Sequence, residues 1–509
     1  MKRGLESPES FIAAYPRNSV SEARALRNRT VAALEFSERV PTRELREECG
    51  VFGVYGAENA ATLVLSGLQD LQHRGQDSSG IATSDGKNLY YHKEAGLVAK
   101  VYTERDMHGL PGRIAIGHDR YSTSKGFGAR HAQPVFIDDV GLALAHNGNI
   151  SALKPLEEFL VSKKISPTKF SDSEMIAEAI AVQMREGMPL PEAIQTTFPI
   201  LVGAFSMLVM NKENLIAVRD AHGIRPLSIG TFGPKKREGY VFSSETCAFP
   251  PIGATHLRDV RPGEMVIIGE KGMQSVKLAK GSQKLDIFEF VYFARPDSSL
   301  LGRTVYTVRK NFGRELAKEH PLDVDLVMPV PQTAIQAAIG YSHETGIPYE
   351  ECLIKARDRR TFIEPAQLRE HGVKTKLTAV QETIQGKRVA VVDDSIVRGT
   401  TSRQIVEMVK NAGAKEVHFL VTSSPVKFPD FYGIDTPKQE ELIAAHKTPE
   451  EIRQFLGADS LHYLSYEGMI RATGLPEHMF CTSCFTGEYP IQIGPRRANS
   501  KGLRIPVGV

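Results

Sequence analysis

Residues 49 to about 269 alternate short apolar runs with polar turns. The runs 50–55, 115–117 and 142–145 predict buried strands, and residues 60–72 predict a helix. Each predicted strand is followed or preceded by a stretch rich in Gly, Asn, Asp, Arg or His. Polar side chains therefore gather at strand ends in this half of the chain, which is where sites are commonly built.

The pattern changes beyond residue 269. A polar stretch through residue 284 reads as a crossover, and the uninterrupted apolar runs 326–331, 389–392 and 417–421 are typical of parallel strands buried on both faces. Residues 402–411 predict a crossover helix that stops before Gly413. The second half is therefore predicted to be an open, doubly wound parallel sheet.

Length and composition bear on the number of domains, the kinds of partner and the cellular location. A chain of 509 residues with 41% hydrophobic and 24% charged content is too long for one core. A net charge of +3 is too small to indicate a nucleic acid partner, and no apolar run is long enough to predict a membrane span. Five scattered cysteines do not form a disulfide framework, which favours a reducing, cytoplasmic location.

Residues 1–48 combine Arg and Glu with short apolar patches. They lack the apolar core of a secretory signal and carry too much acid for a typical transit peptide. We expect a leader that is removed, although an over-extended start site would give the same pattern. The expected division is then a leader at 1–48, domains at 49–280 and 281–470, and a C-terminal tail at 471–509.

Cys49 stands directly before the first predicted strand. If the Glu48–Cys49 bond is cut, one residue carries both a thiol nucleophile and an α-amine of near-neutral pKa that can act as its base. The alternative is a structural cysteine in a core strand, which is the usual role of a lone cysteine.

Five stretches favour the nucleophile. Together they resemble the glutaminase domain of the class II amidotransferases, which are N-terminal-nucleophile hydrolases with an αββα sandwich: CGVFG from Cys49, QHRGQD from Gln72, RYST from Arg120, HNGN from His146 and SDSE from Ser171. The resemblance implies that Cys49 attacks the glutamine amide, while Asn147 and the Gly148 N–H stabilise the oxyanion. It also implies that Arg74 and Arg120 bind the substrate α-carboxylate and Asp172 its α-ammonium. Asp119 departs from the family, which usually has an apolar residue there.

In the second half, the strand at 389–392 ends in the paired acids Asp393 and Asp394. A hydroxyl-rich glycine loop then enters a helix, so backbone N–H groups can converge on a phosphate while the acids bind ribose hydroxyls. The alternative is an ordinary loop at a strand end. The full string resembles the phosphoribosyl pyrophosphate (PRPP) motif of type I phosphoribosyltransferases, which implies PRPP binding by Asp393, Asp394, Ser395, Arg398, Gly399, Thr400 and Thr401.

Joined, the two halves resemble the amidophosphoribosyltransferase family from residue 49 to about 490. The resemblance implies that ammonia from glutamine is channelled to PRPP, giving 5-phosphoribosylamine, glutamate and pyrophosphate in the first committed step of de novo purine (IMP) biosynthesis. It also implies Mg²⁺ held by Thr333, Asp393 and Asp394, purine nucleotide inhibitors, and a homotetramer. The loop 357–363 is shorter than the family's, and Gln332 stands where an acid is expected.

Two other functions remain open at this point. One is a related amidotransferase that passes ammonia to a sugar phosphate or to aspartate, and the motif at 391–401 argues against it. The other is a regulatory PRPP-binding protein without catalysis, and Cys49 with the HNGN stretch argues against that.

Cys481 and Cys484 form a C-x-x-C pair near the C-terminus. By resemblance to cluster-bearing family members, Cys247 and Asp430 complete a ligand set for a 4Fe-4S cluster, with Asp430 replacing a cysteine. The alternatives are a cluster that lacks one iron, a zinc site on the same thiolates, or reduced cysteines packed as small hydrophobic residues.

Overall fold

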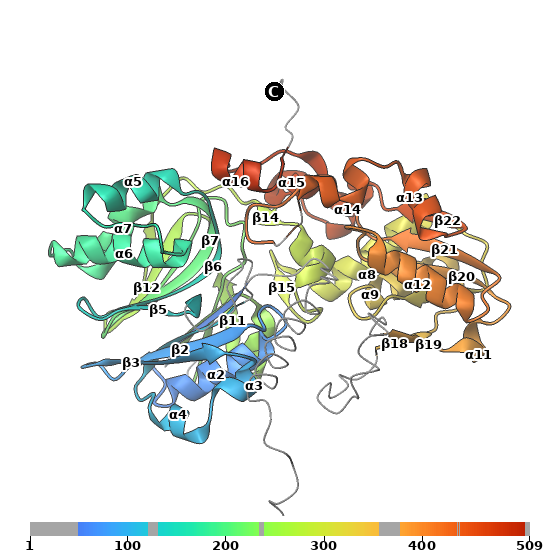
Figure 1. Ribbon diagram of the computed structural model, residues 1–509. Coiled ribbons are helices and arrows are strands. Elements are labelled where there is room, and N and C mark those ends of the chain that lie inside the picture. The colour runs from blue at the N-terminus through green and yellow to red at the C-terminus, as the bar shows by residue number, and fades with distance from the viewer. Residues whose placement is uncertain are drawn as a thin grey trace, which may run out of the picture. The chain divides into compact units, whose positions relative to one another are not determined.

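The computed structural model of the chain describes residues 49–120, 131–233, 239–355, 377–434, 436 and 438–503 (Figure 1). The expected leader, residues 121–123 of the RYST stretch and the loop 357–363 lie outside the described residues. None of the described helices has the length and apolar character needed to cross a membrane.

The first half contains two antiparallel sheets. The seven-stranded sheet has the order β11-β9-β10-β1-β4-β2-β3, with bounds Thr255–Asp259, Ser228–Phe232, Gly239–Ser243, Gly50–Tyr55, Ile114–Arg120, Ser78–Ser84 and Leu89–Ala95. The six-stranded sheet has the order β13-β12-β8-β7-β6-β5, with bounds Gly272–Lys277, Glu264–Gly269, Leu215–Arg219, Val202–Met210, Leu142–Ala152 and Val135–Ile137.

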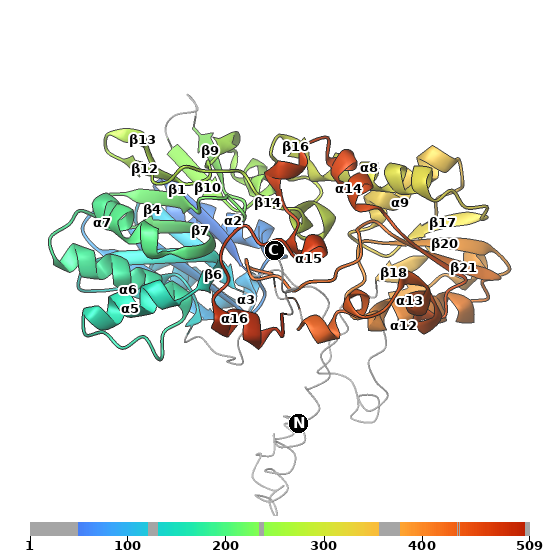
Figure 2. The same cartoon turned by 90° about the horizontal axis from the view of Figure 1, so that it is seen from above.

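Each of these sheets is covered by helices on its outer face. One apolar cluster lies between the sheets and includes Val51, Ile116 and Leu208. A second packs α2 (Ala60–Asp70) on the first sheet, and a third packs α5 (Lys154–Ser162), α6 (Asp172–Arg185) and α7 (Leu190–Thr197) on the second. Strands buried on both faces require apolar residues at successive positions, which β1 supplies. The αββα sandwich expected for an N-terminal-nucleophile hydrolase is confirmed (Figures 1 and 2).

The second half is built on the parallel sheet β17-β20-β21-β22, formed by Leu326–Pro329, Arg388–Asp393, Glu416–Val421 and Ser460–Tyr463. Alternate residues of these strands lie on opposite faces of the sheet. On one face, Val327, Ala390 and Leu420 pack with α8 (Val305–Glu319), α9 (Ile335–Thr345) and α14 (Tyr466–Thr473). Their neighbours Met328, Val391 and Phe419 pack with α12 (Thr400–Asn411) and α13 (Pro449–Leu456). Because helices cover both faces, the doubly wound fold is confirmed (Figure 1).

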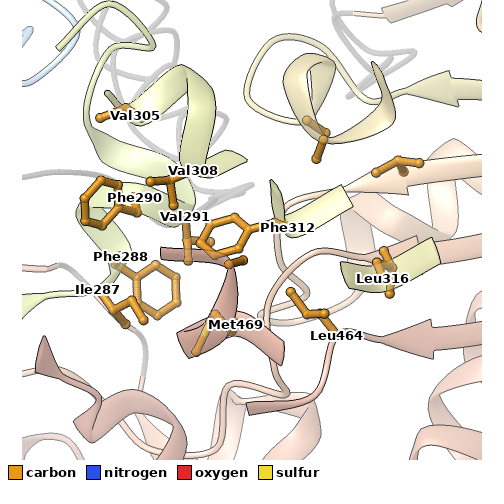
Figure 3. Close-up of a cluster of buried hydrophobic side chains, with 14 of the residues drawn as sticks. Ile287, Phe288, Phe290, Val291, Val305, Val308, Phe312, Leu316, Leu464 and Met469 are labelled. Carbon is orange, nitrogen blue, oxygen red and sulfur yellow. The ribbon is translucent and has the colours of Figure 1, made fainter. Parts of the chain in front are cut away.

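A π-helical turn at Glu289–Phe293 opens this half. Its aromatic and aliphatic side chains pack with α8 and α14, as Figure 3 shows for Phe290, Phe312 and Met469. The remaining helices and strands are α3 Val98–Val101, α4 Glu104–His108, α11 Gln381–Ile384, α15 Ser483–Thr486, α16 Pro495–Ser500, β14 Leu285–Asp286, β15 Ser299–Leu300, β16 Arg303–Thr304, β18 Leu353–Lys355, β19 Leu377–Ala379 and β23 Phe480–Cys481.

Candidate active site

Cys49 lies immediately before β1, at the edge where several strands end. β1 runs antiparallel to β4, with Gly50 opposite Asp119, so Cys49 is brought beside Arg120 at the end of β4. Its side chain is 8% exposed, and its backbone nitrogen donates to the Arg74 carbonyl at 3.2 Å. The nitrogen that would become the α-amine is therefore held in place by the backbone that follows α2.

Asn147 and Gly148 lie within β6, which pairs with β7. The Ser244 hydroxyl joins this strand to the nucleophile strand: it accepts the Val51 N–H at 3.0 Å and the Asn147 Nδ2–H at 3.3 Å. A Cβ on Gly148 would lie 2.1 Å from the Ala204 carbonyl oxygen, so only glycine fits there. Ser244 thus links the strand that follows the predicted nucleophile to the strand that carries both predicted oxyanion donors.

Arg120 and Asp172 flank this edge. The Arg120 guanidinium is partly buried and donates from Nη1 to the His131 carbonyl at 2.8 Å. Asp172 is the first residue of α6, where the Ser171 hydroxyl accepts the Glu174 N–H and the Glu174 carboxylate accepts the Ser171 N–H. The Asp172 carboxylate accepts the Ile150 N–H of β6 at 3.4 Å, which ties it to the strand of Asn147 and Gly148.

Arg74 has a different environment from the one expected. Its guanidinium is fully buried and donates to the carboxylates of Glu245 and Glu289, the latter at 2.6 Å. Burial alone would raise the pKa of Glu245, but Arg74 and His73 hold it well below the usual range. Because Arg74 already has two carboxylate partners, the structure favours a role in fixing the backbone around Cys49 over direct binding of the substrate carboxylate.

Burial disfavours the charged forms of His118 and Asp119 on β4 and of His146 on β6. Burial lowers the pKa of His118 to about 3 and also lowers that of His146, so both imidazoles are neutral. Burial raises the pKa of the Asp119 carboxyl well above its usual range. The raised pKa of Asp119 disfavours a negative charge beside Arg120, and neither histidine is set up as a charged partner for the thiol.

The predicted phosphoribosyl residues meet at the carboxyl edge of the parallel sheet. Asp393 ends β20, and both Asp393 and Asp394 are nearly buried, at 8% and 7% exposure. The Asp394 carboxylate accepts the Ser395 hydroxyl at 2.6 Å and also the Thr333 hydroxyl, which comes from the end of β17. The chain therefore assembles two acids and two hydroxyls from separate segments.

The glycine loop enters α12 as expected. Gly399 is the N-cap residue, and Thr400 and Thr401 are the first two residues of the helix, which residues 394–399 separate from the end of β20. Arg398 is paired with Glu441, which accepts from Nη2 at 2.7 Å. Burial alone would raise the pKa of Glu441, but its bond to Arg398 lowers it.

The residues predicted to hold Mg²⁺ fit that ion. The side chains of Thr333, Asp393 and Asp394 provide only oxygen atoms as ligands. The Asp394 carboxylate accepts a hydrogen bond from the Thr333 hydroxyl. Hard oxygen donors around two partly buried carboxylates are the set that Mg²⁺ prefers, with substrate oxygens and water completing the shell.

The residues predicted to hold a 4Fe-4S cluster do not fit it. Cys481 and Cys484 lie among Asp286 and Asp430, whose charges act on both thiols. Cys247 packs in the apolar cluster of α2, whereas Cys481 and Cys484 belong to other clusters, and its sulfur lies 3.6 Å from Glu245.

Burial raises the pKa of all three thiols. Within the described part of the chain, no three His, Cys, Asp or Glu side chains form a group that could hold a metal ion.

Four residues of these sites escaped prediction: Ser244, Glu245, Asp286 and Glu289. Ser244 and Glu245 lie in the same SSETC stretch as Cys247, and Glu289 lies in the EFVYFARPDS stretch. For the three acids, a carboxylate within an otherwise apolar segment is the signal that could have identified them, because buried acids are almost always paired. No comparable signal marks Ser244.

Comparison with known proteins supports both halves. A model of the glutamine amidotransferase domain matches residues 118–251. Amidophosphoribosyltransferases from Synechocystis sp. and Bacillus subtilis are 47% and 46% identical over 462 and 460 residues, covering 89% and 88% of this chain and 93% and 95% of the relatives. The enzyme of that name from Methanocaldococcus jannaschii is 44% identical over 467 residues, or 87% of this chain and 98% of the relative.

Two solved structures agree with the fold over both halves. One is described as the allosteric regulatory enzyme of purine biosynthesis and superposes with a TM-score of 0.82 at 45% identity, covering 88% of this chain and 97% of its own. The other is glutamine PRPP amidotransferase from B. subtilis complexed with ADP and GMP, with a TM-score of 0.81 at 45% identity and coverage of 88% and 98%.

The fold and the strand-end site define the class: a glutamine amidotransferase joined to a phosphoribosyltransferase-type parallel sheet. Identity of 42–47% across most of the chain is specific enough to go further. The chain belongs to the amidophosphoribosyltransferase family.

Proposed function

We propose that this chain uses the amide of glutamine to aminate PRPP, giving 5-phosphoribosylamine, glutamate and pyrophosphate. The observation that carries the proposal is the Ser244 bridge, which links the strand of Cys49 to Asn147 in the half that precedes the PRPP motif. The regulatory alternative gives no reason for a nucleophile and an oxyanion site to be joined in this way.

In the first step, the α-amine of Cys49, freed by removal of the leader, takes the thiol proton as the sulfur attacks the glutamine amide carbon. The tetrahedral oxyanion receives hydrogen bonds from Asn147 Nδ2 and the Gly148 N–H. The amine then returns the proton to the leaving nitrogen, ammonia departs and a glutamyl thioester remains. Water hydrolyses the thioester to glutamate and restores the thiol.

The residues that flank Cys49 orient the glutamine substrate. Arg120 pairs with the α-carboxylate of glutamine and Asp172 with its α-ammonium. Arg74 acts behind them: its ion pairs with Glu245 and Glu289 hold the carbonyl that receives the Cys49 nitrogen.

In the second half, the N–H groups of the loop entering α12, with Ser395, Thr400 and Thr401, bind the 5-phosphate of PRPP. Asp393 and Asp394 accept hydrogen bonds from the ribose hydroxyls and favour positive charge developing at the sugar carbon. Ammonia attacks that carbon as the bond to pyrophosphate breaks, and it then loses a proton. Thr333, Asp393 and Asp394 would hold Mg²⁺, which would supply positive charge to neutralise the leaving pyrophosphate.

We also propose inhibition by purine nucleotides, supported by the B. subtilis structure, which is complexed with ADP and GMP. The homotetramer expected from the resemblance stays a prediction, as do the cytoplasmic location and the domain boundaries.

The direct test mixes the full chain with PRPP, Mg²⁺ and glutamine and measures pyrophosphate. We expect release that requires all three. A second arm replaces glutamine with ammonia and should also release pyrophosphate. Glutamine hydrolysis with no PRPP-dependent pyrophosphate in either arm would contradict the proposed acceptor.

A further inference from the structure

The segment Asp430–Ile434 forms a closed turn, which we call the 430–434 turn. The fully buried Asp430 carboxylate accepts two N–H groups through one oxygen, from Tyr432 at 2.7 Å and from Ile434 at 2.9 Å. Its own N–H donates to the Thr436 hydroxyl at 2.7 Å. A carboxylate used in this way fixes the shape of its own loop.

The 430–434 turn packs against the oxyanion strand β6. Asn149 donates from Nδ2 to the Phe431 carbonyl at 2.7 Å, across 282 residues of sequence. Gly433 has a φ of 118°, and a Cβ added there would lie 3.3 Å from the Cα of Gly148. The turn therefore touches the residue whose N–H is proposed to bind the oxyanion.

The C-terminal tail supports the turn from behind. Tyr432 donates its hydroxyl to the Ile491 carbonyl at 2.6 Å, and Lys501 donates to the Asp430 carbonyl at 2.9 Å. The tail also binds β6 itself, because the Ser151 hydroxyl donates to the Gln492 carbonyl at 2.8 Å. Hydrogen bonds thus connect the turn with the tail, the tail with β6, and the turn with β6.

The turn is also continuous with the phosphoribosyl site. The chain reaches it from the end of β21, where the Thr422 N–H donates to the Asp393 carbonyl at 2.9 Å. About ten residues therefore separate a contact to the PRPP motif from a contact to Gly148.

We propose that the 430–434 turn is a positioning element for the oxyanion site, so that the second half of the chain sets the catalytic geometry of the first. The inference rests on the proposed function and deepens it. The positioning role requires glycine at position 433, because a side chain there would displace Gly148. Asp430 has the role of anchoring the turn. Oxyanion donors act only when they are aimed within a few tenths of an ångström.

The test compares Gly433→Ala with the parent chain. Losing one oxyanion donor outright costs a factor of roughly 10² to 10³, so displacing it should lower kcat for glutamine hydrolysis about tenfold. We expect KM for glutamine to stay within about twofold and ammonia-dependent synthesis to be unchanged, because binding groups and the PRPP motif are not touched. An unchanged kcat, or an equal fall in both activities, would overturn the proposal.

Gly187→Ala is the matched control. Gly187 also has a positive φ beyond the left-handed α region, of 95°, but nothing lies within 4 Å of an added Cβ. It carries a backbone cost of the same kind without contact to β6, and it should leave kcat for glutamine hydrolysis unchanged. A fall equal to that of Gly433→Ala would also overturn the proposal.

Asp430 gives a second, independent pair of variants. Asp430→Asn keeps the oxygen that accepts the Tyr432 and Ile434 N–H groups and should retain most glutaminase activity, whereas Asp430→Cys removes that acceptor and should lower kcat as Gly433→Ala does. The reverse order would overturn the assignment. Failure of the proposed function looks different, because the parent chain itself would then lack glutamine-dependent pyrophosphate release.

Discussion

At the scale of single residues, the candidate active site depends on a few buried hydrogen bonds. Ser244 is one of them, since its hydroxyl serves both the nucleophile strand and Asn147. Its removal leaves the Val51 N–H and the Asn147 amide without that partner in a buried site. The free energy of unfolding should fall by about 1–3 kcal/mol.

We therefore expect Ser244→Ala to lower kcat for glutamine hydrolysis about tenfold, because Asn147 loses its orientation. Ammonia-dependent synthesis should be retained. Ser84→Ala is the control: Ser84 is equally buried and also has two hydrogen bonds, to the Lys212 carbonyl at 2.7 Å and from the Gly86 N–H at 3.1 Å. Equal losses in both variants would mean that Ser244 acts only through stability.

His118 gives a prediction for pH. Its pKa is about 3 in the folded chain, against about 6.5 when unfolded, so protonation favours the unfolded state. Stability from this group is present above pH 6.5 and is lost as pH falls, by about 1.4 kcal/mol per unit. His118→Gln keeps a donor toward the His146 carbonyl. We expect urea midpoints measured from pH 7.5 to 5 to fall less steeply in this variant, and parallel curves would contradict the assignment.

Residue positions were predicted best where the signal is local. Cys49, Asn147 and Gly148 follow from motifs, and Ser244 links the strands that carry them, while their catalytic roles stay predictions. The environment of Arg74 does not follow from a motif, because its partners Glu245 and Glu289 lie 171 and 215 residues away in sequence. Cys247 likewise lies beside Glu245, away from Cys481 and Cys484. Which buried charge pairs with which is decided by tertiary contacts that no local pattern contains.

At the scale of elements, apolar runs predicted the strands that carry the site. The runs at 326–331, 389–392 and 417–421 became β17, β20 and β21 with small shifts in their ends. The fourth strand, β22, was not predicted, because four residues alternating Ser, Leu, His and Tyr give too weak a signal. The helix expected from residue 402 begins at Thr400, since the preceding Gly399 supplies the N-cap conformation.

The contact between the segments that follow β17 and β20 can be tested at Thr333, whose hydroxyl donates to the Asp394 carboxylate. Thr333→Val keeps the shape and removes the hydroxyl. A hydrogen bond to a charged group contributes about 1.5–3 kcal/mol, so we expect KM for PRPP at fixed Mg²⁺ to rise about tenfold or more.

Glutamine hydrolysis should be unaffected by Thr333→Val. Thr345→Val, which loses a bond to the Tyr341 carbonyl at the far end of α9, should leave KM for PRPP unchanged. A normal KM for PRPP in Thr333→Val would exclude Thr333 from the site.

At the scale of the whole molecule, the two halves share a buried ion-pair network. Glu289, from the turn that opens the second half, accepts from Arg74 at 2.6 Å and lies 3.2 Å from Arg225, with all three side chains fully buried. Composition predicted more than one domain, but it could not predict such contacts, because they join segments that have no pattern in common.

Glu289→Gln should be strongly destabilising. Removing one partner of a buried pair leaves uncompensated guanidinium charge and costs about 3–5 kcal/mol. Denaturant unfolding would measure this, and ammonia-dependent synthesis should decline with the folded fraction, while glutamine hydrolysis should fall further because Arg74 loses a partner behind Cys49. Asp323→Asn, which breaks an exposed pair with Arg388, should change stability little. Equal effects of the two variants would contradict the role given to the network.

The central claim is that two chemically separate sites act in one chain, and Cys49→Ala tests it most directly. Pyrophosphate release is measured with PRPP and Mg²⁺, once with glutamine and once with ammonia, for the parent chain and the variant. We predict that the variant loses the glutamine-dependent reaction and keeps the ammonia-dependent one at the parental rate, because the PRPP motif belongs to a different sheet. Loss of both reactions, or retention of the glutamine-dependent one, would contradict the account.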